Sequence, residues 1–567
     1  MCGIAGWTDF KNNISKQEAA INRMSVTLYN RGPDEGGFYR TPCTVLIHRR
    51  LVVVDPDNGK QPMYLTDDKS SYAMVYNGEL YNTEDLRKEL VEKGHTFTGH
   101  SDTEVLIHSY AQWGTDCLER LNGIYAFAVW DEKEQTLFMA RDRIGVKPFF
   151  FYPYDKGIIF ASQIKTLLAN PLVMPQIDEN GLKELFYLGP GRSGGNGIFK
   201  GIEELKPGEF GIFSKNGLTV KKYWALTAKE HTDNLEQTIE KTRFLITDAI
   251  KRQLVSDVPL CCFLSGGLDS SIISKIAADE YKEAGKRLTT YSVNYEDNES
   301  YFKKSVFQPD SDYKYIKLMS EYINSEHKEV ILDNISLADS LPDAAMARDL
   351  PGMADIDSSL LLFCRKIKEK FTVAVSGECA DEIFGGYPWY HNKDILFEEC
   401  FPWSRSLEIR SGILKDGFIN GGEEYVREKY SETVSGTSYL DTDDKLNRRM
   451  REMFMLNTEW FMQTLLDRKD RMSMATGLEV RVPFCDHRIV EYAYNMPWEM
   501  KALDGREKGI VREAMKGILP DEIVFRKKSP YPKTHNPIFM ECVRNRVKSI
   551  QNDNNSVLSD IINWQTV

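Results

Sequence analysis

Two patterns of hydrophobic spacing divide this chain of 567 residues. In the first two hundred residues, short apolar runs alternate with turn residues, and they predict strands at 44–48, 72–76 and 124–130. Helical spacing is clearest at 82–93 and 102–113. We therefore predict that the chain begins with an α+β domain of stacked sheets.

From about Leu235, helical spacing alternates with short, fully apolar strands. The predicted elements are helix 236–254, strand 260–264, a helix from Ser270, strand 288–293, helix 358–370 and strand 372–375. Such alternation is typical of a parallel sheet with crossover helices, which is an α/β domain. The polar segment 227–234 reads as a linker, so we predict one domain at 2–226 and another at 235–567.

Length and charge narrow the class of protein. At roughly 100–200 residues per domain, the chain has room for two large cores. It carries 72 Lys+Arg against 84 Asp+Glu, a net charge of -12, which argues against nucleic acid or an anionic membrane as partner. It has neither an apolar run of about 18 residues nor a basic and apolar leader. We expect a soluble, cytoplasmic protein.

The ten cysteines and nine histidines show no metal-site spacing. No C-x-x-C pair occurs, and no H-E-x-x-H, so we expect no zinc. We interpret nine of the cysteines as reduced core thiols. The tenth, Cys2, is different because removal of Met1 would leave a thiol and an α-amine on one residue. An amine that titrates near pH 7.7–8.0 can take the thiol proton, although position alone also fits an ordinary cysteine.

A glycine-rich loop follows the predicted strand 260–264. Residues 265–271 read S-G-G-L-D-S-S and lead into a helix. Serine hydroxyls and glycine amides at a helix N-terminus can cradle a pyrophosphate. Asp269 would repel that phosphate unless Mg²⁺ lay between them, so the loop suggests a metal-bound nucleotide. A bare S-G-G is also compatible with an ordinary capped turn.

A second loop, at 376–387, follows the strand at 372–375 and reads S-G-E-C-A-D-E-I-F-G-G-Y. Open α/β sheets bind ligands at the carboxyl ends of their strands, so the two loops are expected to face one ligand. Asp269 and Asp381 would then share Mg²⁺. Taken alone, Asp381 fits equally well as an acid that starts a helix.

With these motifs, the chain resembles the glutamine-dependent asparagine synthetases over almost its whole length. The S-G-G-x-D-S motif is similar to the pyrophosphate motif of ATP pyrophosphatases, and the first half resembles a class II glutamine amidotransferase. The resemblance implies an N-terminal-nucleophile domain followed by an ATP-pyrophosphatase-like domain. It also implies ATP and Mg²⁺ as requirements, and a homodimer.

The resemblance assigns roles in glutamine hydrolysis. Cys2 matches the nucleophile, and residues 31–34 match a loop that closes over glutamine. Arg50 matches the arginine that binds the glutamine carboxylate, for which a bidentate guanidinium is well suited.

The segment 77–79 and Asp102 complete the glutamine site. Asn77 and Gly78 match an oxyanion hole, whose donors are each worth roughly 3 kcal/mol, and Glu79 belongs to the same segment. Asp102 matches the acid that pairs with the substrate ammonium. Each residue alone also has an ordinary reading, such as a hairpin turn at Asn77 or a helix cap at Asp102.

In the second half, the resemblance implies an ATP site, a metal pair and two further catalytic residues. The ATP site comprises Leu264, Ser265, Gly266, Gly267, Asp269, Ser270, Val293, Ser376 and Gly377. Asp269 and Asp381 match metal ligands, and Glu378 matches a residue near the acceptor. Lys508 matches a lysine that stabilises phosphate charge, although a solvated helix lysine would look the same. The segment 481–484 also matches, in a structural role.

Three segments depart from the family pattern. Where asparagine synthetases carry Thr-Thr-x-Arg, this chain has Asp355 at the arginine position, which would favour an acceptor bearing an amine. The insert 296–312 and the basic segment 526–530 are the others. These departures leave the chemistry in place and bear on the acceptor.

We therefore predict a two-site ligase. Cys2 would release ammonia from glutamine, and the second domain would activate a carboxylate as an acyl-adenylate. The expected acceptor is L-aspartate, giving L-asparagine, with another carboxylate such as diaminopimelate in cell-wall precursors as the alternative. A non-catalytic nucleotide or glutamine sensor is disfavoured, because a sensor need not keep the nucleophile and the metal ligands together.

Overall fold

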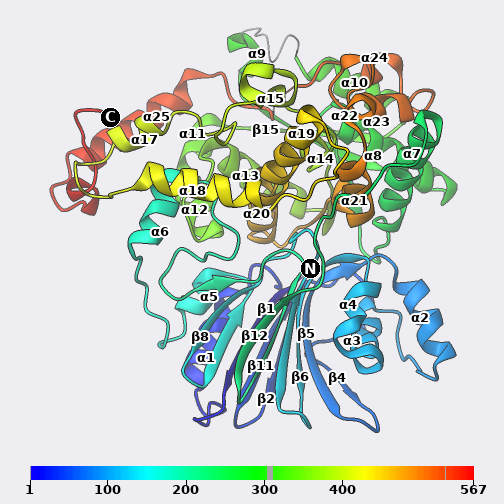
Figure 1. The fold of residues 1–567 in the computed structure, drawn as a ribbon, viewed down its shortest axis with the longest axis vertical. Coiled ribbons are helices and arrows are strands. Elements are labelled where there is room, and N and C mark those ends of the chain that lie inside the picture. The colour runs from blue at the N-terminus through cyan, green and yellow to red at the C-terminus, as the bar shows by residue number, and fades with distance from the viewer. Residues whose placement is uncertain (1, 303–310, 530) are drawn as a thin grey trace.

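The computed structural model describes residues 2–302, 311–529 and 531–567. It has two parts: stacked strands, at the bottom of Figure 1, and a mostly helical part above them. Strand β1 (Gly3–Asp9) begins where the two parts meet, so Cys2 lies at their junction.

The first domain contains two antiparallel sheets that lie face to face. One has the order β10 (Glu203–Glu204), β8 (Phe150–Tyr154), β9 (Gly157–Ala161), β1, β3 (Thr44–Arg50) and β2 (Glu35–Arg40). The other has the order β12 (Gly217–Lys222), β11 (Glu209–Ser214), β7 (Thr136–Arg141), β6 (Gly123–Asp131), β5 (Ser71–Leu80) and β4 (Met63–Thr66). Ile4 and Leu46 from the first sheet meet Val75 and Trp130 from the second, which forms the inner core.

Helices cover the outer faces of both sheets. Helices α1 (Glu18–Thr27) and α5 (Ile164–Leu168) pack on the first sheet, and α2 (Thr83–Glu92) and α3 (Asp102–Trp113) pack on the second. The short helices α4 (Cys117–Arg120) and α6 (Glu179–Lys183) complete this domain. The central strands β1, β3, β5, β6, β7 and β9 are thus buried on both faces, which explains why they read as continuous apolar runs, whereas β2, β4 and β12 are partly exposed.

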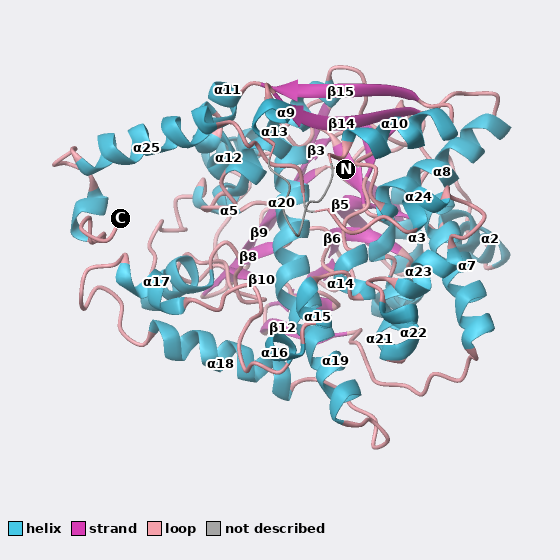
Figure 2. Ribbon diagram, turned by 90° about the horizontal axis from the view of Figure 1, so that it is seen from above, coloured by secondary structure: helices cyan, strands magenta, loops and turns pink. Residues whose placement is uncertain are grey.

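The second domain contains a parallel sheet. Its order is β15 (Glu326–Leu332), β14 (Thr289–Tyr295), β13 (Leu260–Phe263), β16 (Val373–Val375) and β17 (Glu479–Arg481). Helices α7 (Leu235–Arg252) and α8 (Leu268–Glu283) cover one face, and α13 (Asp355–Lys368) and α20 (Met462–Met474) cover the other. Figure 2 shows β14 and β15 along one side of this domain.

The remaining α-helices of the second domain lie around this sheet and beyond it. They are α9 (Asn298–Tyr301), α10 (Tyr313–Tyr322), α11 (Asn334–Asp339), α12 (Leu341–Arg348), α14 (Ala380–Phe384), α15 (Pro388–His391), α16 (Lys393–Leu396), α17 (Leu407–Gly412), α18 (Gly422–Ser435), α19 (Lys445–Leu456), α21 (His487–Asn495), α22 (Trp498–Lys501), α23 (Gly509–Ala514), α24 (Asp521–Val524) and α25 (Pro537–Gln551).

The element bounds differ from the sequence predictions in a few places. Strand β5 runs to Leu80, so Asn77 lies within a strand and not in a hairpin turn. Helix α13 begins at Asp355 rather than at 358 and ends at Lys368. Residues 223–234 form neither helix nor strand.

The cysteines and helices bear on two further expectations. The cysteines are all free thiols, but Cys43, Cys400 and Cys542 are only half-buried, so they are not core residues as expected. Among the described residues, no helix is long and apolar enough to cross a membrane.

Candidate functional site

Cys2 is buried at the point where strands from both sheets of the first domain converge. Its side chain and backbone together are 7 % exposed, and its nitrogen donates to Asn77 Oδ1 at 2.9 Å. Burial raises the pKa of the thiol, while the nearby charge of Arg50 opposes that shift. A thiol in this environment stays protonated at neutral pH and needs a base to become a nucleophile.

Asn77 offers an unused hydrogen-bond donor beside the thiol. While its Oδ1 accepts from Cys2, its Nδ2 is buried and has no partner among the described residues. Buried donors are seldom left unpaired, and an oxyanion hole awaiting its substrate is one reason for it. Gly78 follows on the same strand, and a Cβ there would lie 2.2 Å from the Ile124 carbonyl oxygen, so only glycine fits.

Asp102 and Arg50, expected to bind the α-ammonium and the α-carboxylate of glutamine, are both held by the first domain. Asp102 accepts from the Tyr76 hydroxyl at 2.8 Å and from the Leu80 amide at 3.0 Å, and burial raises its pKa. The Arg50 guanidinium donates to Glu35 at 2.9 Å and to the Asp55 carbonyl oxygen at 2.6 Å. Both groups are therefore positioned before any ligand arrives.

Two residues near Cys2 contact the second domain. The carboxylate of Glu79 lies 3.5 Å from Arg481 of β17, an arginine also paired with Glu479 at 2.6 Å. The segment around Arg481, predicted to be structural, therefore reaches the glutamine site. Arg31, expected in a closing loop, is fully buried and pairs with Asp470 of α20 at 2.6 Å. Nothing local in the sequence marks these contacts.

The two loops predicted to bind phosphate follow adjacent parallel strands of the second domain. Leu260 of β13 pairs with Val373 of β16, so the loops after them leave the same edge of the sheet. In the first loop, Gly266 has a φ of +68°, and a Cβ there would meet the Ile316 nitrogen at 2.8 Å. The hydroxyls of Ser265 and Ser270 lie 2.9 Å apart and close the loop.

Lys508 connects the two loops. Its ammonium lies 2.7 Å from Asp269 and 2.8 Å from Asp381, and Lys528 also pairs with Asp381. Burial would lower the pKa of Lys508, but the two carboxylates raise it above its usual value. Burial would raise the pKa of Asp381, yet the two lysines hold it well below its usual range. Lys508 also has a φ of +54°, a strained backbone that functional sites often contain.

The acids fit a magnesium ion that is completed by a nucleotide. Asp269 and Asp381 both reach the Lys508 ammonium, so one cation can lie between them. Among the described residues, no group of three or more metal-binding side chains is present. Mg²⁺ commonly takes one or two carboxylates together with phosphates and water, so a pair of acids is sufficient here.

A cavity of about 1030 Å³ opens at this edge of the sheet. The predicted residues that line it are Leu264, Ser265, Gly267, Asp269, Ser270, Val293, Ser376, Gly377, Glu378, Asp381 and Lys508. Gly266 is absent from the lining, because it packs against Tyr315 and Ile316. Sequence reasoning missed the cationic wall made by Arg468, Lys469 and Lys528.

Glu378 and Asp355 occupy different environments. Glu378 pairs with Arg468 and with Lys469, each at 3.0 Å, and burial is outweighed by these cations, which lower its pKa. Asp355 begins α13, and the described lining of the cavity includes its neighbours Met353 and Ile356 but not Asp355 itself. Burial raises the pKa of Asp355, and the charge of Lys533, which lines the cavity, opposes that rise, so the influence of Asp355 on the acceptor stays a prediction.

The insert 296–312 contributes to the cavity at both ends, through Asn298, Glu299, Phe302, Ser311 and Asp312. Its central part, 303–310, lies outside the described residues. From the basic segment 526–530, Arg526, Lys527, Lys528 and Ser529 line the cavity. All three departures from the family pattern thus border the synthetase site, since Met353 and Ile356 from the segment around Asp355 also line the cavity.

A buried thiol beside an oxyanion donor in one domain, and paired phosphate loops in the other, define a two-site amidotransferase. The chain belongs to the asparagine synthase family. The asparagine synthase domain matches residues 241–567, and a glutamine amidotransferase domain matches residues 1–224. These matches confirm the predicted fold class, and the chain is an enzyme, a ligase of a family that uses ATP.

Two relatives from Bacillus subtilis (strain 168) align with nearly the whole chain. Asparagine synthetase [glutamine-hydrolyzing] 3 is 52 % identical over 565 residues, which is 99 % of this chain and 92 % of the relative. Asparagine synthetase [glutamine-hydrolyzing] 1 is 30 % identical, over 98 % of this chain and 91 % of the relative.

Proposed function

We propose that this enzyme converts L-aspartate, ATP and L-glutamine into L-asparagine, AMP, pyrophosphate and L-glutamate. The observation that carries the proposal is the cluster of Lys508, Asp269 and Asp381 at the edge of the sheet in the second domain, together with the buried Cys2 of the first. The name and high identity of the first relative support the choice of product.

In the first domain, the Cys2 thiol attacks the side-chain amide of glutamine. The α-amine exposed by removal of Met1 takes the thiol proton, and Asn77 Nδ2 with the Gly78 amide stabilises the oxyanion. Arg50 and Asp102 bind the carboxylate and the ammonium of the substrate. Ammonia leaves, and water then hydrolyses the thioester to give glutamate.

In the second domain, the loop at 265–270 binds the ATP phosphates and Lys508 stabilises the charge that develops on them. Magnesium, when bound by Asp269 and Asp381, would neutralise phosphate charge and orient the nucleotide. The acceptor carboxylate becomes an acyl-adenylate with release of pyrophosphate. Ammonia from Cys2 must arrive through the protein interior, because bulk water would protonate it.

The choice of aspartate as acceptor rests on the name of the first relative and its identity to this chain. The cavity itself carries charges of both signs: Arg468 and Lys469 pair with Glu378, and Lys533 lies in the same lining as Asp269 and Asp381. Diaminopimelate in cell-wall precursors is the alternative acceptor.

Pyrophosphate release with ATP, Mg²⁺ and a panel of carboxylates tests the acceptor. We expect release with L-aspartate and formation of asparagine with either glutamine or ammonium as nitrogen source. Cys2→Ala should abolish glutamine-dependent synthesis while keeping ammonium-dependent synthesis. Activity with a diaminopimelate compound but none with aspartate would overturn the assignment. The proposed homodimer is checked by light scattering of the purified protein.

A further inference from the structure

Three consecutive residues of α20 contact both sites of the enzyme. Arg468 and Lys469 each lie 3.0 Å from Glu378 in the synthetase cavity. The next residue, Asp470, points to the first domain, where it accepts hydrogen bonds from Arg31 at 2.6 and 3.1 Å. A single turn of helix therefore joins the synthetase cavity to the surroundings of Cys2.

Arg31 connects Asp470 to the backbone of Cys2 through hydrogen bonds. Its Nε donates to the Cys2 carbonyl oxygen at 3.1 Å, while Nη1 and Nη2 both donate to Asp470. The guanidinium is rigid and planar, so fixing two of its nitrogens on Asp470 fixes the direction of the third. The position of the Cys2 backbone thus depends on a carboxylate from the other domain.

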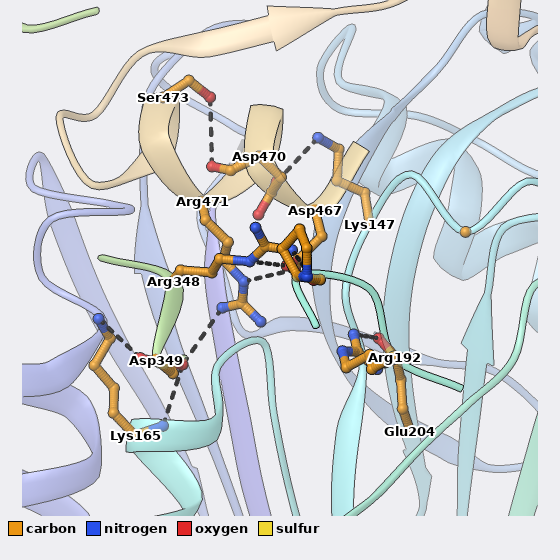
Figure 3. A network of polar contacts seen from close by, with 12 residues as sticks. Lys147, Lys165, Arg192, Glu204, Arg348, Asp349, Asp467, Asp470, Arg471 and Ser473 are labelled. Carbon is orange, nitrogen blue, oxygen red and sulfur yellow. Dashed lines mark hydrogen bonds and ion pairs between the residues drawn. The ribbon is translucent and has the colours of Figure 1, made fainter. Parts of the chain in front are cut away.

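The pair is buried and shares a second cation. The side chains of Arg31 and Asp470 are 0 % and 3 % exposed, and Lys147 lies 3.3 Å from Asp470 with 1 % exposure. Figure 3 shows Lys147 beside α20, with a dashed line joining it to Asp470 on that helix. The two cations hold the pKa of Asp470 far below its usual range against the effect of burial. Removing this carboxylate would leave two buried cations beside the nucleophile without their partner.

We propose that Asp470, a residue of the synthetase domain, is a positioning residue for Cys2 and acts through Arg31. The inference rests on the proposed hydrolysis of glutamine at Cys2. It predicts a defect in the rate of that reaction rather than in binding, because Arg50 and Asp102 bind the substrate and do not depend on Asp470 for their contacts.

The test compares Asp470→Asn with wild type in two assays on the same preparation. For glutaminase, we expect kcat to fall at least about tenfold, since small misplacements of a reacting group cost one or two orders of magnitude, with KM for glutamine unchanged. Ammonium-dependent synthesis should stay within about twofold of wild type and shows that the variant is folded. If wild type itself lacks glutaminase activity, the proposed function fails and not this inference.

The matched control is Asp467→Asn on the same helix. Asp467 pairs with Arg348 at 3.1 Å and with Arg471 at 3.2 Å. The Asp467→Asn variant therefore loses similar ion pairs that do not involve Arg31. It should keep wild-type glutaminase kcat. Equal glutaminase kcat in wild type and Asp470→Asn would overturn the proposal.

If Asp470→Asn fails to fold, a variant with a longer carboxylate side chain tests the proposal instead. Asp470→Glu keeps the charge and displaces Arg31, so we expect reduced glutaminase kcat with ammonium-dependent synthesis retained. A parallel loss of both activities in both variants would assign Asp470 to domain packing alone and would also overturn the proposal.

Discussion

Gly377 and Asp269, which lie on the two phosphate loops, are in direct contact. A Cβ atom on Gly377 would stand 3.0 Å from the Cβ of Asp269 and 3.0 Å from the Ser270 nitrogen. Cβ atoms rarely approach other atoms so closely, so a larger residue at 377 would push the two loops apart by a few tenths of an ångström. The separation of the two acids, Asp269 and Asp381, depends on this contact.

Gly377→Ala should therefore impair the synthetase half alone. An added methyl group in a packed site costs about 1–3 kcal/mol, so we expect pyrophosphate release to fall about 10–100-fold. Glutaminase activity should be unchanged, because the substitution lies in the other domain. Gly412→Ala is the control, since a Cβ there meets only Thr566 at 3.9 Å. Wild-type pyrophosphate release in Gly377→Ala would show that the loop contact is not needed.

The unpaired Nδ2 of Asn77 gives a prediction for the first domain. Asn77→Asp keeps an oxygen to accept from the Cys2 nitrogen but removes the donor that would face the oxyanion. We expect kcat for glutamine hydrolysis to fall about 10²–10³-fold, with ammonium-dependent synthesis retained. Glutamate release at saturating glutamine measures this kcat. A variant that hydrolyses glutamine at the wild-type rate would remove Asn77 from the oxyanion hole.

The place of the glycine- and serine-rich loop between β13 and α8, and the bounds of helix α3, could be predicted from the sequence because their signals are local. Glycines, serines and Asp269 stand within six residues of one another, and α3 spans Asp102–Trp113, the same bounds that the apolar spacing indicates. Each pattern reflects backbone geometry or one amphipathic face, which a short window of sequence records.

The contact between Arg31 and Asp470 left no such signal. The two residues are 439 positions apart and belong to different domains, so nothing near either residue in the sequence indicates the other. Asn77 illustrates a related limit: Asn-Gly favours a turn, but pairing of β5 with β6 keeps the segment extended, with Asn77 opposite Ala126. The role of Asp355 stays a prediction, because it depended on an alignment and not on a physical pattern.

Magnesium should be needed by only one of the two sites. Chelation with EDTA should abolish pyrophosphate release, because the acids Asp269 and Asp381 lie in the second domain, and should leave glutaminase activity intact. Both activities can be followed in one sample. Loss of glutaminase activity on chelation would contradict a metal site confined to the second domain.

Lys528 gives a finer test of the metal site because it pairs with Asp381, a proposed ligand. Lys528→Met removes a cation that competes with the metal, so the free Mg²⁺ concentration for half-maximal pyrophosphate release should fall severalfold. Lys527→Met is the matched control: it removes the same charge from a neighbouring position in the cavity lining. An equal fall in the half-maximal Mg²⁺ concentration in both variants would mean that the net charge of the cavity, and not the contact with Asp381, sets the Mg²⁺ requirement.

Lys501 gives a prediction about stability and pH. It is 6 % exposed, its ammonium lies 4.7 Å from the centre of the Phe454 ring, and burial lowers its pKa to about 7. Between pH 7 and the pKa of 10.5 of an unfolded lysine, the unfolded chain binds a proton that the folded chain does not. The cost in stability of burying the charged lysine is therefore largest below pH 7 and falls as the pH rises. The full cost is roughly 5 kcal/mol.

Lys501→Met should therefore raise Tm at pH 7, and its advantage over wild type should shrink at pH 9.5. Thermal unfolding at both pH values measures the difference. Lys445→Met is the matched control, because Lys445 lies 5.1 Å from the Phe397 ring but is exposed, so its ammonium remains hydrated and the substitution should not change Tm in a pH-dependent way. If the gain from Lys501→Met were the same at both pH values, the stabilisation would come from apolar packing and not from removal of a buried charge.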